Sequence, residues 1–596
     1  MTASELVPWH SWGAAAFKAA QDQDKPILLD IGAVWCHWCH VMDQTTYADP
    51  EVVALIKEHF VPIKVDTDRR PDVNLRYNQG GWPTTAFLAP TGELLVGFTY
   101  LPPETMVQVL RQIHDQWEAN ASNIKGRLAA LQEERRGRRE APRPGQRIRQ
   151  SFVQDVLASL RSEFDPAYGG FGRGQKFPHP EAVRLLLDQA SVRHQGDLLA
   201  MARKTLDGML GLYDEVHGGF YRYSVDREWR EPHYEKMAEV NAGAIENFVQ
   251  LYQATGEGKY LEAVAGTIGY LRGRLYQPEQ GYFGASQDAD VGSHDPEQRY
   301  VTGEVYFELD AGGRAQYAEP YVDSTLYADT NARLACALLR AYAVTGEAEW
   351  AQLGKAALDN TWDALHKPEG GVYHFLDGDE TRVYGLLADQ ALMLRAVLDA
   401  YEILGESRYL DRARQLAAFM EEALADGQSG GFYDQPAEGE DRYGALDVRV
   451  KSLTDNAVAA QGLLRLHHLT GEQDYRRAVG RTLEYFAPEY SRMGLFAAGY
   501  ATAVDHYLRE PAHVVIVDGQ DGRSAHALLR AAGSTYAPWK VVQLLKPERD
   551  RERIAELGFP TKAEPTAYVC IGELCMIAEA PEKLKAALVG SSNDGN

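Results

Sequence analysis

The sequence predicts a multidomain protein in which an α/β domain is followed by an all-α (α/α)6 toroid and a small C-terminal α/β appendage. Three observations predict this order: an apolar run that ends at two closely spaced cysteines, a helical-hairpin pattern that recurs through the middle of the chain, and short apolar runs that alternate with helical stretches near its end. We expect the α/β domain over residues 1–120, the end of a helix and a basic linker over 121–149, the toroid over 150–508, and the appendage with a disordered tail over 509–596.

The composition of the chain argues against several classes of protein. Its 596 residues are too many for one hydrophobic core, and 45% hydrophobic with 24% charged residues are values typical of globular proteins. The net charge of −24 disfavours nucleic acid and anionic membranes, and no apolar window reaches the roughly 18 residues of a membrane span. Five cysteines are too few for a disulfide scaffold, and the N-terminus has no basic segment followed by an apolar stretch. We therefore expect a cytoplasmic protein without a signal peptide.

The first domain is predicted from a strand that leads into two cysteines at the start of a helix. Cys36 and Cys39 are three residues apart and follow an apolar run. At a helix start, unpaired backbone N–H groups and the positive end of the helix dipole favour the thiolate of Cys36, which is the reactive form of the residue. Asp30 lies on the incoming strand, Trp35 precedes the first cysteine, and Pro83 opens a second apolar strand. This set of residues favours redox chemistry.

The same five residues resemble the active site of the thioredoxin superfamily. The resemblance implies that Cys36 attacks, that Cys39 resolves the mixed disulfide, and that the buried Asp30 handles protons. It also implies that Trp35 and Pro83 shape the substrate groove, with Pro83 in a cis peptide bond that faces the disulfide.

Longer motifs are similar to those of one family within that superfamily. They are Trp35-Cys36-His37-Trp38-Cys39-His40, Gly81-Trp82-Pro83, Lys176-Phe177-Pro178-His179-Pro180, Pro232-His233-Tyr234-Glu235-Lys236-Met237, Asp288-Ala289-Asp290 and Ala567-Tyr568-Val569-Cys570. Together they resemble the spermatogenesis-associated, or thioredoxin-domain-containing, proteins over nearly the whole chain. The resemblance implies a thioredoxin-like domain joined to a helical toroid that is similar to sugar epimerases and six-hairpin glycosidases.

The cysteine motif leaves other interpretations open. With His40 it also fits the C-x-x-C-H pattern of c-type haem attachment, a modification that normally follows export. Cys36, His37, Cys39 and His40 offer metal ligands, but neighbours on one helical turn make a poor tetrahedral set by themselves. A structural or vestigial motif is the third alternative. We favour the redox interpretation, in which a cationic His37 would support the thiolate, and we expect neither a cofactor nor a metal.

The toroid is predicted from a repeated helical unit. Four segments run without gaps from a polar amide residue to the residue before a glycine, namely 241–255, 331–345, 390–404 and 456–470. Each spans about four helical turns and ends at a glycine C-cap, and a glycine-aromatic turn such as Gly430-Gly431-Phe432 lies ahead of it. Long loops between the hairpins favour a closed toroid over an open solenoid. We expect one of these loops, 288–327, to cover the mouth of the toroid.

Aromatic and acidic residues in these loops predict a sugar-binding funnel at one end of the toroid. Rings stack on sugars, and paired acids supply the acid and base of glycosyl chemistry. The candidate substrate-binding residues are His179, His233, Glu235, Asp288 and Asp290. Asp329, Asp389 and Asp455 stand at helix starts, where we expect N-caps rather than catalytic groups.

The C-terminal appendage carries two further cysteines, Cys570 and Cys575, near a strand end. They are either packing residues or a second dithiol that exchanges with the first, and we favour packing because buried strand cysteines are usually inert.

These features favour one function and leave two alternatives. The favoured function is a thioredoxin-type thiol–disulfide oxidoreductase fused to a toroid that binds a carbohydrate-like ligand or a partner protein. One alternative is a sugar epimerase or glycoside hydrolase-like toroid with a structural or regulatory thioredoxin-like domain, and the other is a scaffold without catalytic activity. The expected partner is a protein dithiol or disulfide. Neither nucleic acid nor a membrane is expected, because the basic residues of 125–149 lie near Pro and Gly, as in a solvated linker.

Overall fold

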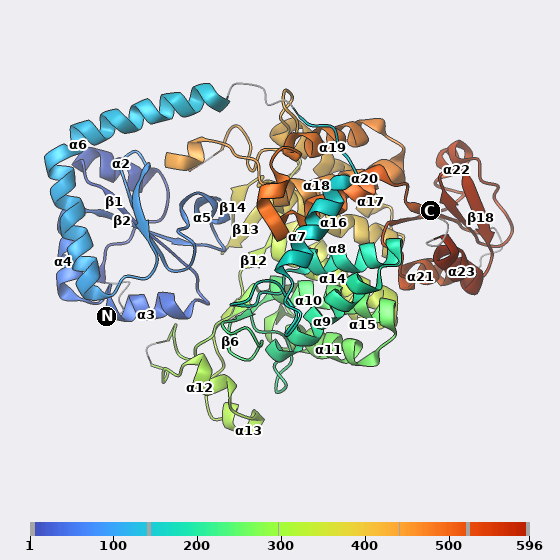
Figure 1. The fold of residues 1–596 in the computed structure, drawn as a ribbon, viewed down its shortest axis with the longest axis horizontal. Helices are drawn as coiled ribbons and strands as arrows, with labels where there is room; N and C mark the ends of the chain where they lie inside the picture. Colours follow the sequence, from blue (N-terminus) through green and yellow to red (C-terminus); the bar gives the residue numbers. More distant parts are fainter. Residues whose placement is uncertain (1–5, 140–144, 296, 440, 520–524, 592–596) are drawn as a thin grey trace. The chain divides into compact units, whose positions relative to one another are not determined.

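The computed structural model describes residues 6–139, 145–295, 297–439, 441–519 and 525–591 (Figure 1). Two compact units account for the chain. The first comprises Met1–Arg143, Ser286–Asp323 and Pro436–Val450, and the second comprises Pro144–Ala285, Ser324–Gln435 and Lys451–Asn596. The end of the chain, where a disordered tail is expected, and residues 140–144 of the expected linker lie outside the described residues. Among the described helices, none is both long enough and apolar enough to cross a bilayer.

The first unit contains a four-stranded mixed sheet in the order β2-β1-β3-β4, in which β1 pairs parallel with β2 and antiparallel with β3 (Figure 1). The strands are β1 (Ile27–Gly32), β2 (Val61–Asp66), β3 (Thr84–Leu88) and β4 (Leu94–Phe98). The helices are α2 (Ala14–Gln23), α3 (His37–Thr45), α4 (Pro50–His59), α5 (Pro71–Tyr77) and α6 (Pro103–Arg139). This topology confirms the predicted thioredoxin-like fold.

Strand β1 is buried on both faces because helices cover each side of the sheet. Ile27, Leu29 and Ile31 pack in one cluster with residues of α2 and α5. Leu28 packs in a second cluster with residues of α4 and α6. Side chains alternate between the faces of a strand, so Asp30 shares the face of Leu28 and lies as a carboxyl group within a hydrophobic core.

Two segments from later in the sequence complete the first unit. The segment 286–323 contains β10 (Ser286–Gln287), β11 (Val322–Asp323), α12 (Gly303–Phe307) and α13 (Ala311–Arg314), and the segment 436–450 contains the 3-10 turn η4 (Gly444–Asp447). Leu446 packs in the core beside β1, and Tyr77 Oη accepts a hydrogen bond of 2.7 Å from the backbone N–H of Ala445. Of the loop 288–327, which we expected to cover the mouth of the toroid, residues 288–323 belong to the first unit.

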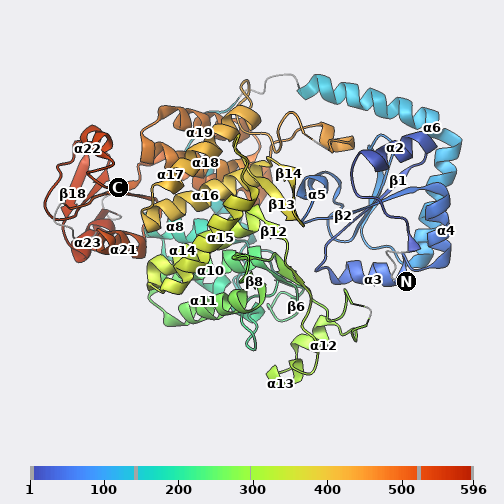
Figure 2. The ribbon, with the colours of Figure 1, turned by 180° about the vertical axis from the view of Figure 1, so that it is seen from behind.

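The second unit contains the toroid, a closed ring of helices (Figures 1 and 2). The inner helices are α8 (Pro180–Arg193), α10 (Ala238–Thr255), α14 (Ala328–Thr345), α16 (Leu387–Leu404), α18 (Leu453–Thr470) and α20 (Ala498–Leu508). Each contacts the next, and α20 contacts α8, which closes the ring. The outer helices are α7 (Ser151–Glu163), α9 (Gly196–Met209), α11 (Gly258–Tyr270), α15 (Ala348–Leu365), α17 (Arg408–Phe419) and α19 (Gln473–Phe486). Six inner and six outer helices confirm the (α/α)6 prediction.

The repeated amide residue of each hairpin joins an inner helix to the turn ahead of it. Asn241 Oδ1 accepts a hydrogen bond of 2.7 Å from the backbone N–H of Phe220, and its Nδ2 donates to the carbonyl of the same residue. The same two-way contact joins Asn331 to Phe283, Gln390 to Val372 and Asn456 to Phe432. The amide thereby satisfies both backbone groups of a buried turn residue, which explains why the amide and the glycine-aromatic turn recur together.

The three aspartates expected to be N-caps lie two or three residues after the N-caps of their helices. The N-caps of α14, α16 and α18 are Tyr327, Leu386 and Ser452, and Ser452 accepts a hydrogen bond from the backbone N–H of Asp455. Asp329, Asp389 and Asp455 are residues of the first turn. The prediction of capping was wrong because each of these three helices has 18 residues and begins before the carboxylate.

Buried lysine–aspartate pairs hold three of the loops of the toroid. Lys176 bonds Asp165 at 2.9 Å, Lys236 bonds Asp214 at 2.6 Å, and Lys451 bonds Asp426 at 2.7 Å. Each ammonium group also donates to a carbonyl of its loop, at Gly172, Gly218 and Gly430. Two of the motifs that resemble the family, around Lys176 and around Lys236, therefore contain structural lysines.

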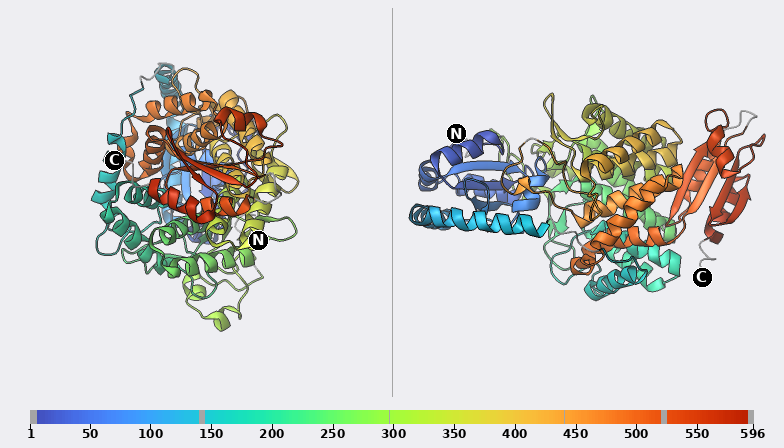
Figure 3. Two further views of the ribbon diagram at one scale, coloured as in Figure 1. Left: turned by 90° about the vertical axis from the view of Figure 1, so that its right-hand side faces the viewer. Right: turned by 90° about the horizontal axis from the view of Figure 1, so that it is seen from above.

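Short strands lie in the loops of the second unit, and the C-terminal appendage follows the toroid within this unit. The loop strands are β5 (Tyr223–Ser224), β6 (Pro232–His233), β7 (Lys236–Met237), β8 (Tyr276–Gln277), β9 (Tyr282–Phe283), β12 (Leu326–Tyr327), β13 (Tyr373–Asp377) and β14 (Glu380–Tyr384), and the short helical turns are η1 (Leu210–Leu212), η2 (Leu271–Leu275), η3 (Met420–Leu424) and η5 (Tyr490–Ala497). The appendage has the sheet order β16-β15-β17-β18, and the left view of Figure 3 shows it in front of the helical ring. Its elements are β15 (Ala512–Val517), α21 (His526–Ser534), β16 (Lys540–Leu545), α22 (Arg551–Leu557), β17 (Thr566–Ile571), β18 (Leu574–Ala578) and α23 (Pro581–Ser591).

The appendage has a mixed sheet, and its cysteines differ from expectation. Only β15 and β16 pair in parallel, because β17 and β18 return as an antiparallel hairpin. Cys570 and Cys575 face each other across this hairpin in a disulfide, so they are not plain packing residues.

Candidate active site at the cysteine pair

The two cysteines of the first unit lie at the N-terminus of α3. Cys36 is the N-cap residue, and its Sγ accepts a hydrogen bond of 3.2 Å from the backbone N–H of Cys39. The two residues form a disulfide, and their side chains are nearly buried, with 4% and 8% of their surface exposed. In the reduced form, the same backbone N–H and the helix dipole would stabilise a thiolate at Cys36.

Aromatic side chains surround the first cysteine. Trp35 is buried, and its indole N–H donates a hydrogen bond of 2.7 Å to Asp68. The rings of Trp35 and Trp82 meet edge to face with 5.7 Å between their centroids. The peptide bond between Trp82 and Pro83 is cis. The structure thus brings the ring of Trp35, the residue before Cys36, into contact with that of Trp82, the residue of the cis peptide bond.

Asp30 lies on the face of β1 that the second cysteine contacts. Gly32, two residues further along this face, is so close to Cys39 that a Cβ there would lie 3.4 Å from its Sγ. Burial raises the pKa of Asp30 to about 6, although the positive charge of Lys64, whose Nζ is 3.5 Å from the carboxylate, opposes the rise. Lys64 bonds Asp43 more closely, at 2.6 Å. The carboxyl group of Asp30 therefore takes up a proton at a higher pH than an exposed aspartate does.

We expect Asp30→Asn to stabilise the first unit at neutral pH. The rise in pKa from 3.8 to about 6 corresponds to about 3 kcal/mol that the ionised carboxylate costs the folded protein. Because the folded state holds the proton more tightly, this cost develops as pH rises from about 4 to 6 and is constant above that range. Urea unfolding should show a gain approaching about 3 kcal/mol at pH 7.5 that shrinks toward zero at pH 4. The exposed Asp115→Asn is the control, and a gain that is equal at both pH values would contradict the assignment.

A buried carboxylate from the segment 286–323 holds the histidine between the cysteines. Asp290 Oδ2 lies 2.7 Å from His37 Nδ1 and accepts a hydrogen bond of 3.0 Å from the hydroxyl of Tyr300. Its other oxygen accepts the backbone N–H of Gly303 at 3.0 Å. Asp290 is fully buried, so these contacts compensate its charge.

A second carboxylate of the segment binds the histidine that follows Cys39. Asp288 Oδ2 lies 2.9 Å from His40 Nε2 and 3.1 Å from His294 Nε2, and it accepts a hydrogen bond of 2.6 Å from Ser293. Burial alone would lower the pKa of His40, but the bond and charge of Asp288 outweigh it and raise that pKa. Burial alone would raise the pKa of Asp288, but the bonds from His294 and His40 lower it. The pair therefore favours an imidazolium beside the cysteine motif.

These contacts correct the sequence-based placement of Asp288 and Asp290, which we expected in the funnel of the toroid. They lie in the first unit because the imidazoles of α3 provide partners for their buried charges. The role of His40 opposite Asp288 and the contribution of His294 were missed. The signal in the sequence was the spacing of Asp288, Asp290 and His294 within one polar segment, and nothing local linked it to α3.

The other three candidates lie in the second unit. His179 precedes α8 with a positive φ of 46°, and burial lowers its pKa to about 4. His233 Nδ1 lies 3.3 Å from Glu235 Oε1, and its ring stacks on Tyr223 with 4.4 Å between centroids. Phe177 stacks on the other side of Tyr223 at 4.5 Å. The structure therefore brings His233 and Glu235 together beside an aromatic stack.

Two groups in the described residues have the composition of a metal site. They are His40, Asp288 and His294 in the first unit, and Asp329, His374 and Asp389 in the second, with ligand atoms within 4.8 Å of one another. Imidazole–carboxylate hydrogen bonds explain this proximity in both groups, since His374 Nδ1 lies 3.0 Å from Asp389 Oδ1. His40 Nε2 is likewise hydrogen-bonded to Asp288, so the ring nitrogen that would ligate a haem iron already has a carboxylate partner. We assign no metal to either group.

The fold and the site together define a class of protein, in which a thioredoxin-like unit with a C-x-x-C pair at a helix N-terminus shares its chain with an (α/α)6 toroid. Residues 1–135 match the family model Thioredox_DsbH, described as a protein of unknown function, DUF255. Spermatogenesis-associated protein 20 of Homo sapiens is 27% identical over 96% of this chain and 88% of its own length. The predicted resemblance to the spermatogenesis-associated, thioredoxin-domain-containing proteins is confirmed along nearly the whole chain.

Two further similarities were found. An uncharacterised protein of Caenorhabditis elegans is 27% identical over 92% of this chain and 80% of its own length. Among solved structures, a sugar epimerase from a ruminal bacterium covers 57% of this chain and 87% of its own, with 14% identity and a TM-score of 0.46.

Proposed function

We propose that the first unit is a thiol–disulfide oxidoreductase of the thioredoxin type. The observation that carries this proposal is the position of Cys36 as the N-cap of α3, with His37 and His40 of the same turn held by buried carboxylates. Helix dipole, backbone N–H and imidazolium each favour the thiolate over the thiol.

The reaction takes place in two exchange steps. The thiolate of Cys36 attacks one sulfur of a partner disulfide, forms a mixed disulfide, and releases the other sulfur as a thiolate. Cys39 then loses its proton to Asp30 and attacks Cys36 Sγ, which releases the second partner thiolate and leaves the Cys36–Cys39 disulfide. The partner gains two electrons, and a dithiol reductant returns the pair to its reduced form. The cytoplasm, which we predict as the location, contains such reductants.

The surface around the pair indicates where a partner makes contact. Trp38, between the cysteines, has 47% of its surface exposed, whereas Cys36 and Cys39 are nearly buried. Its ring also lies 5.4 Å from that of Tyr100. We infer that a partner first packs on Trp38 and reaches the sulfur from that side, because aromatic side chains contribute strongly to such contacts.

We expect Asp288→Asn to move the pH dependence of the reaction to higher pH. Without this carboxylate, the raised pKa of His40 falls, its imidazolium is lost at a lower pH, and the thiol of Cys36 becomes harder to ionise. The measurement is the rate of alkylation of Cys36 by iodoacetamide against pH in the reduced protein, with Asp115→Asn as control. An unchanged profile would remove Asp288 from the mechanism.

The experiment that tests the proposed function is reduction of insulin disulfides by the full chain with dithiothreitol as the reductant, compared between the wild type and Cys36→Ser. The carbohydrate-like ligand of the toroid stays a prediction.

A further inference from the structure

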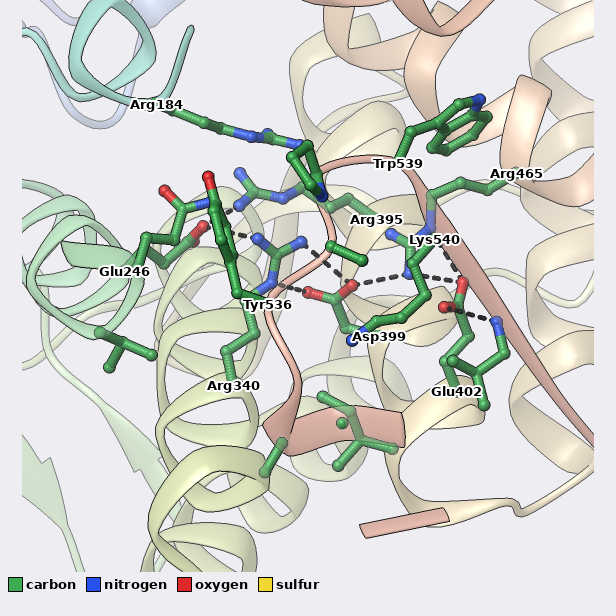
Figure 4. Close-up of a pocket in the computed structure, with 18 of the residues that line it drawn as sticks. Arg184, Glu246, Arg340, Arg395, Asp399, Glu402, Arg465, Tyr536, Trp539 and Lys540 are labelled. Atoms are coloured by element: carbon green, nitrogen blue, oxygen red, sulfur yellow. Dashed lines mark hydrogen bonds and ion pairs between the residues drawn. The ribbon is translucent and has the colours of Figure 1, made fainter. Parts of the chain in front are cut away.

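The toroid contains a charged cavity of about 170 Å³ that is lined by the later turns of α10, α14 and α16 and by the first turns of α8. Side chains from α8, α10, α14, α16, α18 and α20 line it, and the stretch between α21 and β16 crosses it with Tyr536, Trp539 and Lys540 (Figure 4). The half-buried Gln250, Gln253 and Tyr536 form part of its rim. None of the residues predicted for the sugar funnel lines this cavity, although His179 directly precedes α8, which contributes Glu181 and Arg184 to it.

Most charges in the cavity are arranged in a continuous network. Asp399 accepts from Arg340 at 2.7 Å and from Arg465 at 2.8 Å, and Arg465 also bonds Glu402 at 2.8 Å. Glu246 bonds Arg340 at 3.1 Å and also bonds Arg395 (Figure 4). Burial would raise the pKa of Asp399, but Arg340 and Arg465 lower it, so the carboxylate stays ionised. Asp399 and Glu246 therefore each neutralise two arginines.

The network leaves hydrogen-bond donors of two arginines unused. The guanidinium of Arg184 lies 3.9 Å from the carboxylate of Glu181 and 3.7 Å from that of Asp188, distances that are too long for hydrogen bonds. Its buried Nε has no hydrogen-bond partner among the described residues. The Nε of Arg395 is buried and likewise without a partner in the described part of the chain. Leaving a buried donor unsatisfied costs stability, so such groups are retained where a ligand satisfies them.

The unsatisfied donors, rather than the net charge, indicate the sign of that ligand. Five lysine and arginine side chains and four carboxylates line the cavity, and Asp188, 3.7 Å from Arg184, adds a fifth carboxylate beside it. Lys540 donates to the carbonyls of Ala532 and Thr535, so one of its three N–H groups is still free, and burial lowers its pKa to about 8. His506 is buried among these cations and burial lowers its pKa strongly, so it adds no charge.

We propose that this cavity binds a phosphate group, either free or on a small ester, through Arg184, Arg395 and Lys540. Guanidinium groups present forked donors that match the oxygens of phosphate, and an ammonium group adds a point charge. A tetrahedral oxyanion takes several donors from different directions, as three cations from α8, α16 and the 533–540 stretch provide. The small volume favours inorganic phosphate or an ester of a few carbons over a nucleotide.

The test is calorimetric titration of the full chain with inorganic phosphate at constant ionic strength, with glycerol 3-phosphate and acetate as parallel titrants. We expect one saturable site for phosphate and little heat from acetate. Whichever of inorganic phosphate and glycerol 3-phosphate binds with the higher affinity indicates whether the cavity takes free phosphate or a phosphate ester. Arg184→Gln should weaken phosphate binding at least tenfold. The control is Arg272→Gln in η2, where 54% of the arginine side chain is exposed, and this variant should bind phosphate as the wild type does. No saturable binding, or equal affinity in Arg184→Gln, would overturn the proposal.

Two further measurements separate ligand binding from a structural role of Arg184. Because Arg184→Gln removes the cation beside the carboxylates of Glu181 and Asp188, the variant should unfold at a lower temperature without phosphate, so the readout is the gain on adding phosphate, which the wild type should show and the variant should lose. In the wild type, phosphate should protect Arg184 from modification by phenylglyoxal, detected by mass spectrometry. Equal modification with and without phosphate would contradict the site even if the variant failed to fold.

Discussion

The Cys36→Ser variant is expected to reduce insulin no faster than dithiothreitol alone. Serine keeps the size and the N-cap hydrogen bond of this position, so α3 should remain intact. The hydroxyl is a poor nucleophile toward a disulfide, because only a thiolate exchanges with it at useful rates. The loss should therefore be complete in the turbidity assay, without a change in thermal unfolding.

Two other cysteine variants make this experiment decisive. Cys336→Ser removes the free, buried cysteine of α14 and should leave the rate unchanged. Cys39→Ser, reduced and then freed of dithiothreitol, should stop at the mixed disulfide with a disulfide-bonded substrate such as insulin, which a non-reducing gel detects as a covalent adduct. If Cys36→Ser retains the rate of the wild type, the first unit is not an oxidoreductase of this type.

The Lys236→Met variant is expected to lose about 3–5 kcal/mol of stability in the second unit, because it leaves the buried Asp214 without its cation. Both side chains have 1% of their surface exposed, so water cannot replace the lost partner. Methionine keeps most of the packing against Tyr221 and Tyr270, whose rings lie 5.2 and 4.4 Å from the ammonium group. Urea unfolding followed by circular dichroism measures the change.

Lys259→Met is the matched control for this variant. Its ammonium group bonds Asp207 at 2.7 Å on the surface, with 46% and 36% of the two side chains exposed. Exposed pairs contribute about 0–1 kcal/mol, so the control should unfold almost as the wild type does. Similar losses in both variants would show that burial is not what makes the Lys236 pair important.

The parts of the fold that the sequence predicted are those encoded locally or periodically. The cysteine pair follows its strand within a few residues, and the glycine at the end of each inner helix recurs at a fixed distance from the amide. Gly256, Gly346, Gly405 and Gly471 all adopt the left-handed conformation of a helix C-cap, with φ between 73° and 83°. Such signals are complete within one window of sequence.

The parts that could not be predicted depend on contacts between distant segments. Asp288 and Asp290 are polar residues in a long loop, and only the folded chain shows that they meet His40 and His37 rather than a funnel of the toroid. The helix starts at Asp329, Asp389 and Asp455 were placed too late because the stop signal, glycine, is stronger than any start signal in these repeats. The pairing of each amide with its turn likewise joins residues that are 18 to 48 positions apart, across a loop of variable length.

The order in which the first unit is assembled follows from its discontinuous sequence. His40 is 248 residues ahead of Asp288, and the last segment of the unit ends at Val450, so the ribosome has made part of the toroid before the cysteine site is complete and most of it before the unit is complete. During synthesis the two thiols leave the ribosome well before the carboxylates that bind His37 and His40. A prematurely terminated chain that ends before residue 288 therefore carries the cysteines without a finished site, and a gene fragment for residues 1–143 encodes only part of this unit.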